Sequence, residues 1–352
     1  MASKRSAIRR AARPPAGAAV PRNQDAPSPC ACGKPAIYVR RHEGRAYCRS
    51  CFCESLEAKV RKTILKHRLV EKGDRIAVGL SGGKDSSSLL FLLHRFFAKR
   101  PDISLVAISV DEGIAGYRSQ TLEKAKALCR QLGVEHQIVS FRQGLGKTLD
   151  HRLRDAKDSC TYCGVGRRYL LNQAAREAKA SKLAVGHNLD DEAQSVLMNF
   201  FRGDLLRAGR MGTLAADAAQ GGQGFVPRIK PLRFIPEREL TLYAVLKGIP
   251  YSDAECHYIR GLRPLVRDFL YDLENRYPGT RYAVVESFDK LKPALRALPR
   301  QPLRACSRCG EPSSQEVCKA CELWPGKRAR NRTVPARRSR DSGQVKKQQR
   351  TR

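Results

Sequence analysis

Along the middle of the chain, short runs of apolar residues alternate with segments in which apolar residues recur at helical spacing. Short apolar runs predict buried strands, and apolar residues at helical spacing predict a helix after each run. The predicted strands lie near residues 75–80, 104–110, 136–141 and 182–187. The predicted helices lie near residues 86–99, 119–132, 165–180 and 190–202. This alternation favours an α/β fold with a doubly wound parallel sheet, in which ligands bind at the carboxyl ends of the strands.

The first predicted strand leads directly into the segment SGGKDS, residues 81–86. Its adjacent glycines allow a tight turn, and the backbone N–H groups at the start of the next helix form an anion site together with Lys84. Ser86 is the expected N-cap of that helix. The segment differs from the common phosphate loop G-x-x-x-x-G-K-S/T, and Asp85 beside Lys84 suits a Mg2+ ion that bridges to phosphates.

The same segment resembles the PP-loop of the adenine-nucleotide α-hydrolases, which implies cleavage of ATP between its α- and β-phosphates. Polar residues after the second and fourth predicted strands should reach the same site. Asp111 is expected beside the adenosine unless it only forms a turn. Asp190 and Asp191 either cap the next helix or hold magnesium. The expected ATP-binding residues are Leu80, Ser81, Gly82, Gly83, Lys84, Asp85, Ser86, Asp111, His187, Asp190 and Asp191.

Eight of the thirteen cysteines form two sets with metal-ligand spacing. Cys306, Cys309, Cys318 and Cys321 have the C-x2-C-x8-C-x2-C spacing of a zinc ribbon. The N-terminal set contains Cys32, Cys48 and Cys51, and Cys30 is the best candidate for its fourth ligand, with Cys53 and His42 as alternatives. Neither set has an obvious open position, so we expect two structural Zn2+ ions.

A third set, Cys160, Cys163 and Cys256, carries the candidate sulfur chemistry. The first two begin a predicted helix, where the helix N-terminus and nearby arginines should lower the thiol pKa. Three thiolates can hold an iron–sulfur cluster with one iron left free. Alternatively, one cysteine carries a persulfide that another resolves. The non-catalytic alternatives are part of a zinc site or buried structural cysteines. ATP-dependent activation combined with delivered sulfur indicates thiolation.

The charge of the chain indicates a polyanionic partner. Lys and Arg number 67 against 34 Asp and Glu, which gives a formal net charge of +33, and basic segments lie inside the chain as well as in its tails. No apolar run of about 18 residues is present, so no membrane span is expected. The Arg-rich N-terminus is compatible with an organellar transit peptide, but a disordered tail and a cytoplasmic location are favoured.

The order of these features resembles the eukaryotic and archaeal branch of the tRNA 2-thiolation family. The matching segments include SGGKDS, VDEGIAGYR, SCTYCGVGRRYLLN, GHNLDDEAQSVLMNFFRGD and SDAECHY, and they run with the cysteine sets from about residue 30 to residue 325. The resemblance implies a second thiolation subunit as a heterodimer partner, and a ubiquitin-like sulfur carrier with a C-terminal thiocarboxylate. Two departures are a shorter spacing between Cys30 and Cys32, and Arg167 where relatives often have lysine. Arg167 and Arg168 are candidate RNA or phosphate contacts.

These observations divide the chain into five parts and predict an enzyme that thiolates RNA. The resemblance implies that its target is the wobble uridine of tRNA. A PP-loop amidotransferase or lysidine-type tRNA synthetase would use the same loop without the three cysteines. A zinc-ribbon RNA-binding scaffold would need neither the loop nor the three cysteines. The expected parts are a disordered basic tail (1–29), an N-terminal zinc module (30–53), a PP-loop domain with an RNA-binding surface (54–300), a zinc ribbon (301–325) and a second disordered basic tail (326–352).

Overall fold

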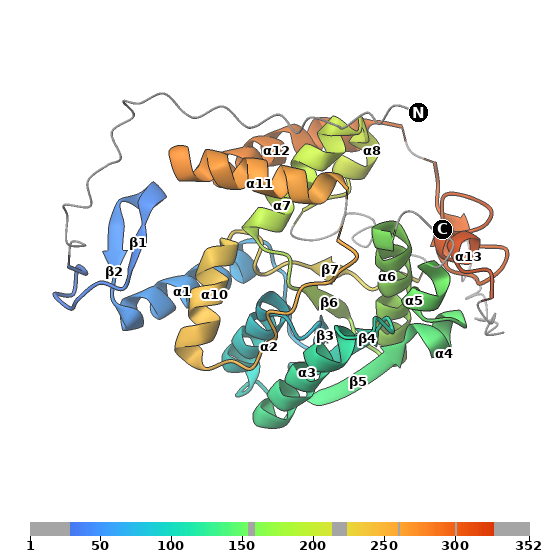
Figure 1. The fold of residues 1–352 in the computed structure, drawn as a ribbon, viewed down its shortest axis with the longest axis horizontal. Coiled ribbons are helices and arrows are strands. Elements are labelled where there is room, and N and C mark those ends of the chain that lie inside the picture. Colours follow the sequence, from blue (N-terminus) through green and yellow to red (C-terminus); the bar gives the residue numbers. More distant parts are fainter. Residues whose placement is uncertain (1–28, 154–158, 213–223, 260, 300, 327–352) are drawn as a thin grey trace, which may run out of the picture. The chain divides into compact units, whose positions relative to one another are not determined.

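A computed structural model describes residues 29–153, 159–212, 224–259, 261–299 and 301–326 (Figure 1). The chain divides into two compact units, with the boundary after Phe52. Both expected basic tails lie almost wholly outside the described residues. Within the described part of the chain, no helix has both the length and the apolar character that crossing a membrane requires.

The second unit is built on a five-stranded parallel sheet with the strand order β5-β4-β3-β6-β7. Its strands are β3 Arg75–Gly79, β4 Ser104–Asp111, β5 Glu135–Ser140, β6 Lys182–Val185 and β7 Arg228–Ile229. The chain passes from β3 to β4 and β5 on one side, and then returns to place β6 on the other side of β3. The strand order therefore reverses between β3 and β6, and in such sheets ligands bind where it reverses. The predicted doubly wound parallel sheet is confirmed.

Helices cover both faces of this sheet. Ala174 and Ala175 of α6 pack with Ala77, Ile108 and Leu183 on one face. Because neighbouring strand residues point to opposite faces, the fully buried Ile76 and Val78 face the other side, where α2 and α3 pack. Helix α1, Arg49–Lys66, crosses the boundary between the two units. The helices described between it and the C-terminal cysteine set are α2 Lys84–Phe97, α3 Arg118–Leu132, α4 Phe141–Leu145, α5 Leu149–Arg152, α6 Ser159–Glu177, α7 Leu189–Phe201, α8 Leu205–Ala208, α10 Glu237–Lys247, α11 Leu262–Arg276 and α12 Thr280–Ala297.

Two predicted helix starts are wrong. Gly83 is the N-cap of α2, with extended backbone, so Ser86 lies inside the first turn instead of capping it. Helix α6 begins at Ser159, six residues before the predicted range of 165–180, although the prediction that Cys160 and Cys163 lie at the start of a helix is confirmed. The two-residue strand β7 was not predicted, because it is too short to produce a hydrophobic period.

The C-terminal cysteine set belongs to the core of the second unit. It lies on the short hairpin of β8 Arg304–Ala305 and β9 Pro312–Ser313 and on α13 Lys319–Leu323. Trp324 follows α13, and it is 1% exposed. Its ring packs edge-on against Phe141 and Tyr162, at centroid distances of 5.1 and 6.3 Å. Three of the four cysteines are buried in the same cluster.

The first unit is a small hairpin followed by the start of α1. Its elements are β1 Tyr38–Arg40, the 3-10 helix η1 Arg41–Glu43 and β2 Arg45–Tyr47. Arg40 is buried and donates to Glu43 at 3.0 Å and to the Tyr47 hydroxyl at 3.2 Å. A unit this small has little apolar core, so a bound metal ion would contribute much of its stability.

Candidate nucleotide and cysteine sites

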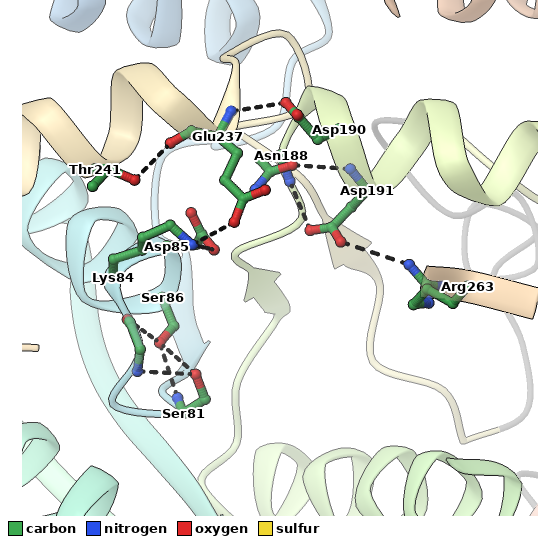
Figure 2. A network of polar contacts seen from close by, with 11 residues as sticks. Ser81, Lys84, Asp85, Ser86, Asn188, Asp190, Asp191, Glu237, Thr241 and Arg263 are labelled. Carbon is green, nitrogen blue, oxygen red and sulfur yellow. Dashed lines mark hydrogen bonds and ion pairs between the residues drawn. The ribbon is translucent and has the colours of Figure 1, made fainter. Parts of the chain in front are cut away.

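The segment SGGKDS joins β3 to α2 at the point where the strand order reverses. Gly82 has a φ of +86°, and a Cβ atom there would lie 1.9 Å from the carbonyl oxygen of Thr121, so no other residue fits without movement of the backbone. The Ser86 hydroxyl lies 2.9 Å from that of Ser81 and donates to the Gly83 carbonyl at 3.1 Å. The structure thus uses Ser86 to hold the loop closed (Figure 2).

The segment after β6 lies against this loop. A Cβ atom on Gly186 would lie 3.0 Å from the backbone nitrogen of Ser86, so the two segments are in close contact. Asn188 caps α7 by accepting from the Asp191 backbone N–H at 2.9 Å, and the Asp191 carboxylate accepts in return. Asp191 therefore completes a capping box. The imidazole of His187 is exposed, but desolvation by surrounding protein and the charge of Lys230 lower its pKa.

Lys84 is surrounded by carboxylates (Figure 2). Its Nζ atom lies 2.6 Å from Glu237 and 3.4 Å from Asp85. Burial raises the pKa of Asp85 to about 6, because Lys84 only partly offsets it and the charges of Asp191 and Glu237 add to it. The Oδ1 atom of Asp85 is buried without a hydrogen-bond partner within the described residues. A loop rich in N–H groups with these carboxylates beside it can bind a metal-bound nucleotide.

Sequence reasoning missed Glu237. This residue opens α10, where an acidic side chain suits the helix dipole. That local signal could have identified an acidic helix start, but not the contact with Lys84, 153 residues earlier. Leu80, the predicted ATP-binding residue that directly precedes the loop, is buried and donates its backbone N–H to the Ile108 carbonyl.

Two predicted nucleotide ligands make other contacts. Asp190 pairs with Arg281 at 2.6 Å and accepts from the Glu237 backbone N–H at 2.8 Å, so both of its oxygens are engaged. It joins α7 to α10 and α12, and burial raises its pKa to about 6. The Asp111 carboxylate accepts from the Gly113 backbone N–H at 2.9 Å, which is the turn-forming contact given as the alternative.

Cys160, Cys163 and Cys256 belong to two distant segments that lie near each other, but they are not among the groups of described residues whose sulfur atoms all lie within 4.8 Å of one another. The first two lie in the first turns of α6, and Cys256 lies in the segment that leads to Tyr258. Ser159 donates to the Tyr258 carbonyl at 3.0 Å, and Cys160 contacts the same oxygen at 3.8 Å. Cys163 and Cys256 both pack against the cluster that contains Trp324, whereas Cys160 is exposed.

The predicted lowering of the thiol pKa is wrong for Cys163. Burial raises the pKa of Cys163 to about 11, although Arg167 opposes the shift. Burial also raises the pKa of Cys256. Apolar packing thus outweighs the helix N-terminus and the arginine. A metal centre reverses this preference, because a coordinating thiol loses its proton. Two partly buried thiols, Cys163 and Cys256, with the exposed Cys160 beside them, offer three ligands for an iron–sulfur cluster.

The other two cysteine sets each bring four sulfur atoms within 4.8 Å of one another. The N-terminal group consists of Cys30, Cys32, Cys48 and Cys51, so neither Cys53 nor His42 belongs to it. The C-terminal group consists of Cys306, Cys309, Cys318 and Cys321. Four thiolates at this spacing fit a tetrahedral Zn2+ ion.

Arginines converge next to the cysteine site. Arg167 lies one helical turn after Cys163, and its side chain is half exposed. The guanidinium of Arg228 on β7 donates to the Arg168 carbonyl at 3.2 Å. The pKa of Arg168 is lowered to about 10 by desolvation and then by the charges of Arg228 and Arg207. Cations that repel one another in this way favour a bound anion such as an RNA phosphate.

The parallel sheet, the SGGKDS loop and the residues facing it define a nucleotide-binding protein of the PP-loop class. The family model of the PP-loop domain matches residues 54–273. Haloferax volcanii tRNA 2-thiolation protein NcsA is 36% identical over 309 residues, which cover 83% of this chain and 96% of that protein. Danio rerio cytoplasmic tRNA 2-thiolation protein 1 is 38% identical over 299 residues, which cover 83% of this chain and 86% of that protein.

A solved structure has the same fold. It is that of the U34-tRNA thiolase NcsA from Methanococcus maripaludis with its [4Fe-4S] cluster, and it matches with a TM-score of 0.72 and 38% identity. The match covers 84% of this chain and 94% of that one. The chain belongs to the tRNA 2-thiolation family of PP-loop proteins.

Proposed function

We propose that the protein is a tRNA-uridine 2-sulfurtransferase that uses ATP to replace the C2 oxygen of the wobble uridine with sulfur. The observation that carries this proposal is the combination, in one compact unit, of a PP-loop with a separate three-cysteine site. The names of the relatives support it, since two are tRNA 2-thiolation proteins and the solved neighbour is a thiolase for uridine 34. An amidotransferase would not need the cysteines.

The nucleotide site activates the uridine. The loop N–H groups and Lys84 bind the phosphates of ATP, and Asp85 holds Mg2+ through its free oxygen. Lys84 must exchange its contact with Glu237 for one with phosphate. The wobble uridine leaves the base stack and enters the site. Its C2 oxygen attacks the α-phosphate, pyrophosphate leaves, and an adenylylated uridine remains.

The cysteine site completes the exchange. Cys160, Cys163 and Cys256 would hold a [4Fe-4S] cluster, which when bound would present sulfide derived from the carrier's thiocarboxylate to C2 of the activated uridine. Adenylylation makes the C2 oxygen a good leaving group, and AMP carries it away. Apolar packing around Cys163 and Cys256 excludes water, which would otherwise return the activated uridine to its starting state.

The remaining features fit binding and assembly roles. Zn2+ ions in the two four-cysteine groups stabilise a module at 30–53 and a ribbon at 301–325, which precede and follow a catalytic domain at 54–300 in the sequence. Arg167 and Arg168 contact tRNA phosphates. A second thiolation subunit and a ubiquitin-like carrier with a C-terminal thiocarboxylate would act as partners, in the cytoplasm.

Two partial reactions test this proposal. Purified anaerobic protein should exchange labelled pyrophosphate into ATP only when tRNA is present, and should then transfer labelled sulfur into 2-thiouridine. Asp85→Asn should lose both reactions, and Cys163→Ser only the second. Incorporation of nitrogen would instead identify an amidotransferase. Tight tRNA binding without any exchange would favour the RNA-binding scaffold.

A further inference from the structure

A buried ion pair lies between the nucleotide loop and the cysteine site. Glu112, directly after β4, places one carboxylate oxygen 2.9 Å from Nε of Arg118, the first residue of α3. Each side chain is only 4% exposed. Burying two charges carries a desolvation penalty that often cancels their attraction, so such a pair is weak evidence for stability. A role in fixing geometry is a better reason for its presence, and the proposed chemistry does not use it.

One end of the pair contacts the nucleotide loop. Arg118 donates from Nη1 to the Ser81 carbonyl at 2.6 Å and to the Thr121 hydroxyl at 2.9 Å. The backbone of Thr121 is the group that lies directly against Gly82. Arg118 therefore holds the loop through one direct contact and one neighbouring contact.

The other end contacts the cysteine helix. The second carboxylate oxygen of Glu112 lies 3.8 Å from Nη1 of Arg167, on α6. The Glu112 carbonyl also accepts from the Leu149 backbone N–H at 2.7 Å, which fixes the position of its backbone. Polar groups thus lie close together from Ser81 through Arg118 and Glu112 to Arg167. The Ser81–Arg118 step is a hydrogen bond, whereas the two steps through Glu112 are ion pairs, and Oε2 of Glu112 and Nε of Arg118 form no hydrogen bond within the described residues.

We propose that Glu112 and Arg118 are positioning residues that couple the nucleotide loop to the first turns of α6. Nucleotide that orders the loop then also orders the helix that carries Cys160 and Cys163. The consequence for sulfur transfer rests on the proposed function: the coupling would make sulfur delivery at the cysteine site depend on nucleotide bound at the loop. The coupling itself requires only a nucleotide and the protein.

Hydrogen–deuterium exchange with a non-hydrolysable ATP analogue tests the coupling without tRNA or iron. In the wild-type protein, the analogue should slow exchange in residues 80–86 and also in residues 159–168. In Glu112→Gln, the loop should remain protected while the protection of 159–168 is lost. Arg167→Gln keeps the buried pair and cuts only the contact with α6, so it should show the same loss even if Glu112→Gln folds poorly.

Glu57→Gln is the matched control. Glu57 is also a buried carboxylate paired with cations, Arg95 at 3.0 Å and Lys247 at 3.1 Å, but it contacts neither site. This variant should retain protection of both segments. In turnover assays, Glu112→Gln should lower the 2-thiouridine formed per pyrophosphate released by roughly threefold to thirtyfold, while Glu57→Gln should leave that ratio unchanged.

The outcomes separate the two proposals. If the analogue fails to protect residues 80–86 in the wild type, the nucleotide site and with it the proposed function are wrong. If the loop is protected and 159–168 is not, only the coupling is wrong. Equal protection of 159–168 in the wild type, Glu112→Gln and Arg167→Gln would also overturn it.

Discussion

The nucleotide site and the cysteine site are built in opposite ways. The first is polar and its loop is shaped largely by local contacts: the six-residue loop closes through its own hydroxyls, and a second short segment caps its own helix. The second is assembled from α6 and the segment around Cys256, and Trp324 from the C-terminal ribbon packs behind it. Two of its thiols, Cys163 and Cys256, pack against an apolar cluster and their pKa values are raised by burial, whereas Cys160 is exposed.

This difference predicts how far the effect of a substitution reaches from each site. Loss of a loop hydroxyl should act mainly within the loop, because the Ser81 and Ser86 side chains bond to each other and to the loop backbone. Longer-range contacts reach the loop only through groups such as Arg118 and Glu237. A change in the ribbon should reach the cysteines, because Trp324 donates to the Tyr162 carbonyl, between Cys160 and Cys163 in the sequence. The two sites can therefore be separated by variants that remove one function and spare the other.

The largest effect is expected for the cysteines. Serine at position 160, 163 or 256 should lower thiolation by more than about a hundredfold, and double variants should lose little more, because residues that act as a unit are not additive. Iron content of anaerobically prepared protein should fall with each change. Exchange of pyrophosphate into ATP should stay within about threefold of the wild type, since no cysteine contacts the loop in this scheme.

Cys129→Ala supplies the control for these variants. Cys129 is buried on α3, outside the three-cysteine site, and burial alone raises its pKa to about 11. Its loss should reduce stability and leave thiolation and iron content intact. Full thiolation by Cys256→Ser would show that Cys160 and Cys163 act without Cys256, and would contradict the assignment of a three-cysteine site.

The same contrast explains what the sequence could predict. The sheet class, four of its five strands and the loop SGGKDS follow from period and spacing, because their determinants lie within a few neighbouring residues. The role of Glu237 could not be predicted, since its contact with Lys84 spans 153 residues. The raised pKa of Cys163 was missed because the local helix N-terminus is visible in the sequence, whereas the cluster that buries the thiol is not.

A smaller effect is expected from the ribbon. Trp324→Leu removes a fully buried ring and should destabilise the unit by roughly 2–4 kcal/mol. Because the lost contacts include Tyr162, iron content and thiolation should fall by about tenfold, which corresponds to transmission of about 1.4 kcal/mol of the lost free energy to the cysteine site. Binding of an ATP analogue, measured by calorimetry, should change less than about twofold.

Phe288→Leu tests whether this effect is specific. Phe288 is as buried as Trp324, but it packs with Val196 and Ala208 in a different cluster. It should lower the melting temperature without a change in iron content. Equal loss of iron in both variants would mean that the cysteine site responds to stability in general, and that the ribbon has no special connection with it.

The smallest effect concerns pH and the nucleotide site. Burial raises the pKa of Asp85 to about 6, so its carboxylate gains a proton as the pH falls through that value. Mg2+ needs the ionised form, so Mg2+-dependent binding of an ATP analogue should weaken about fourfold between about pH 7.5 and about pH 5.5. The folded state should not lose stability through this group, because a raised carboxyl pKa means that protonation favours the fold. In Asp85→Asn, the nucleotide's phosphates still titrate but the carboxylate is absent. The variant should therefore bind the analogue more weakly at about pH 7.5, and its affinity should depend less on pH. An identical pH profile in the variant and the wild type would show that Asp85 does not hold the metal.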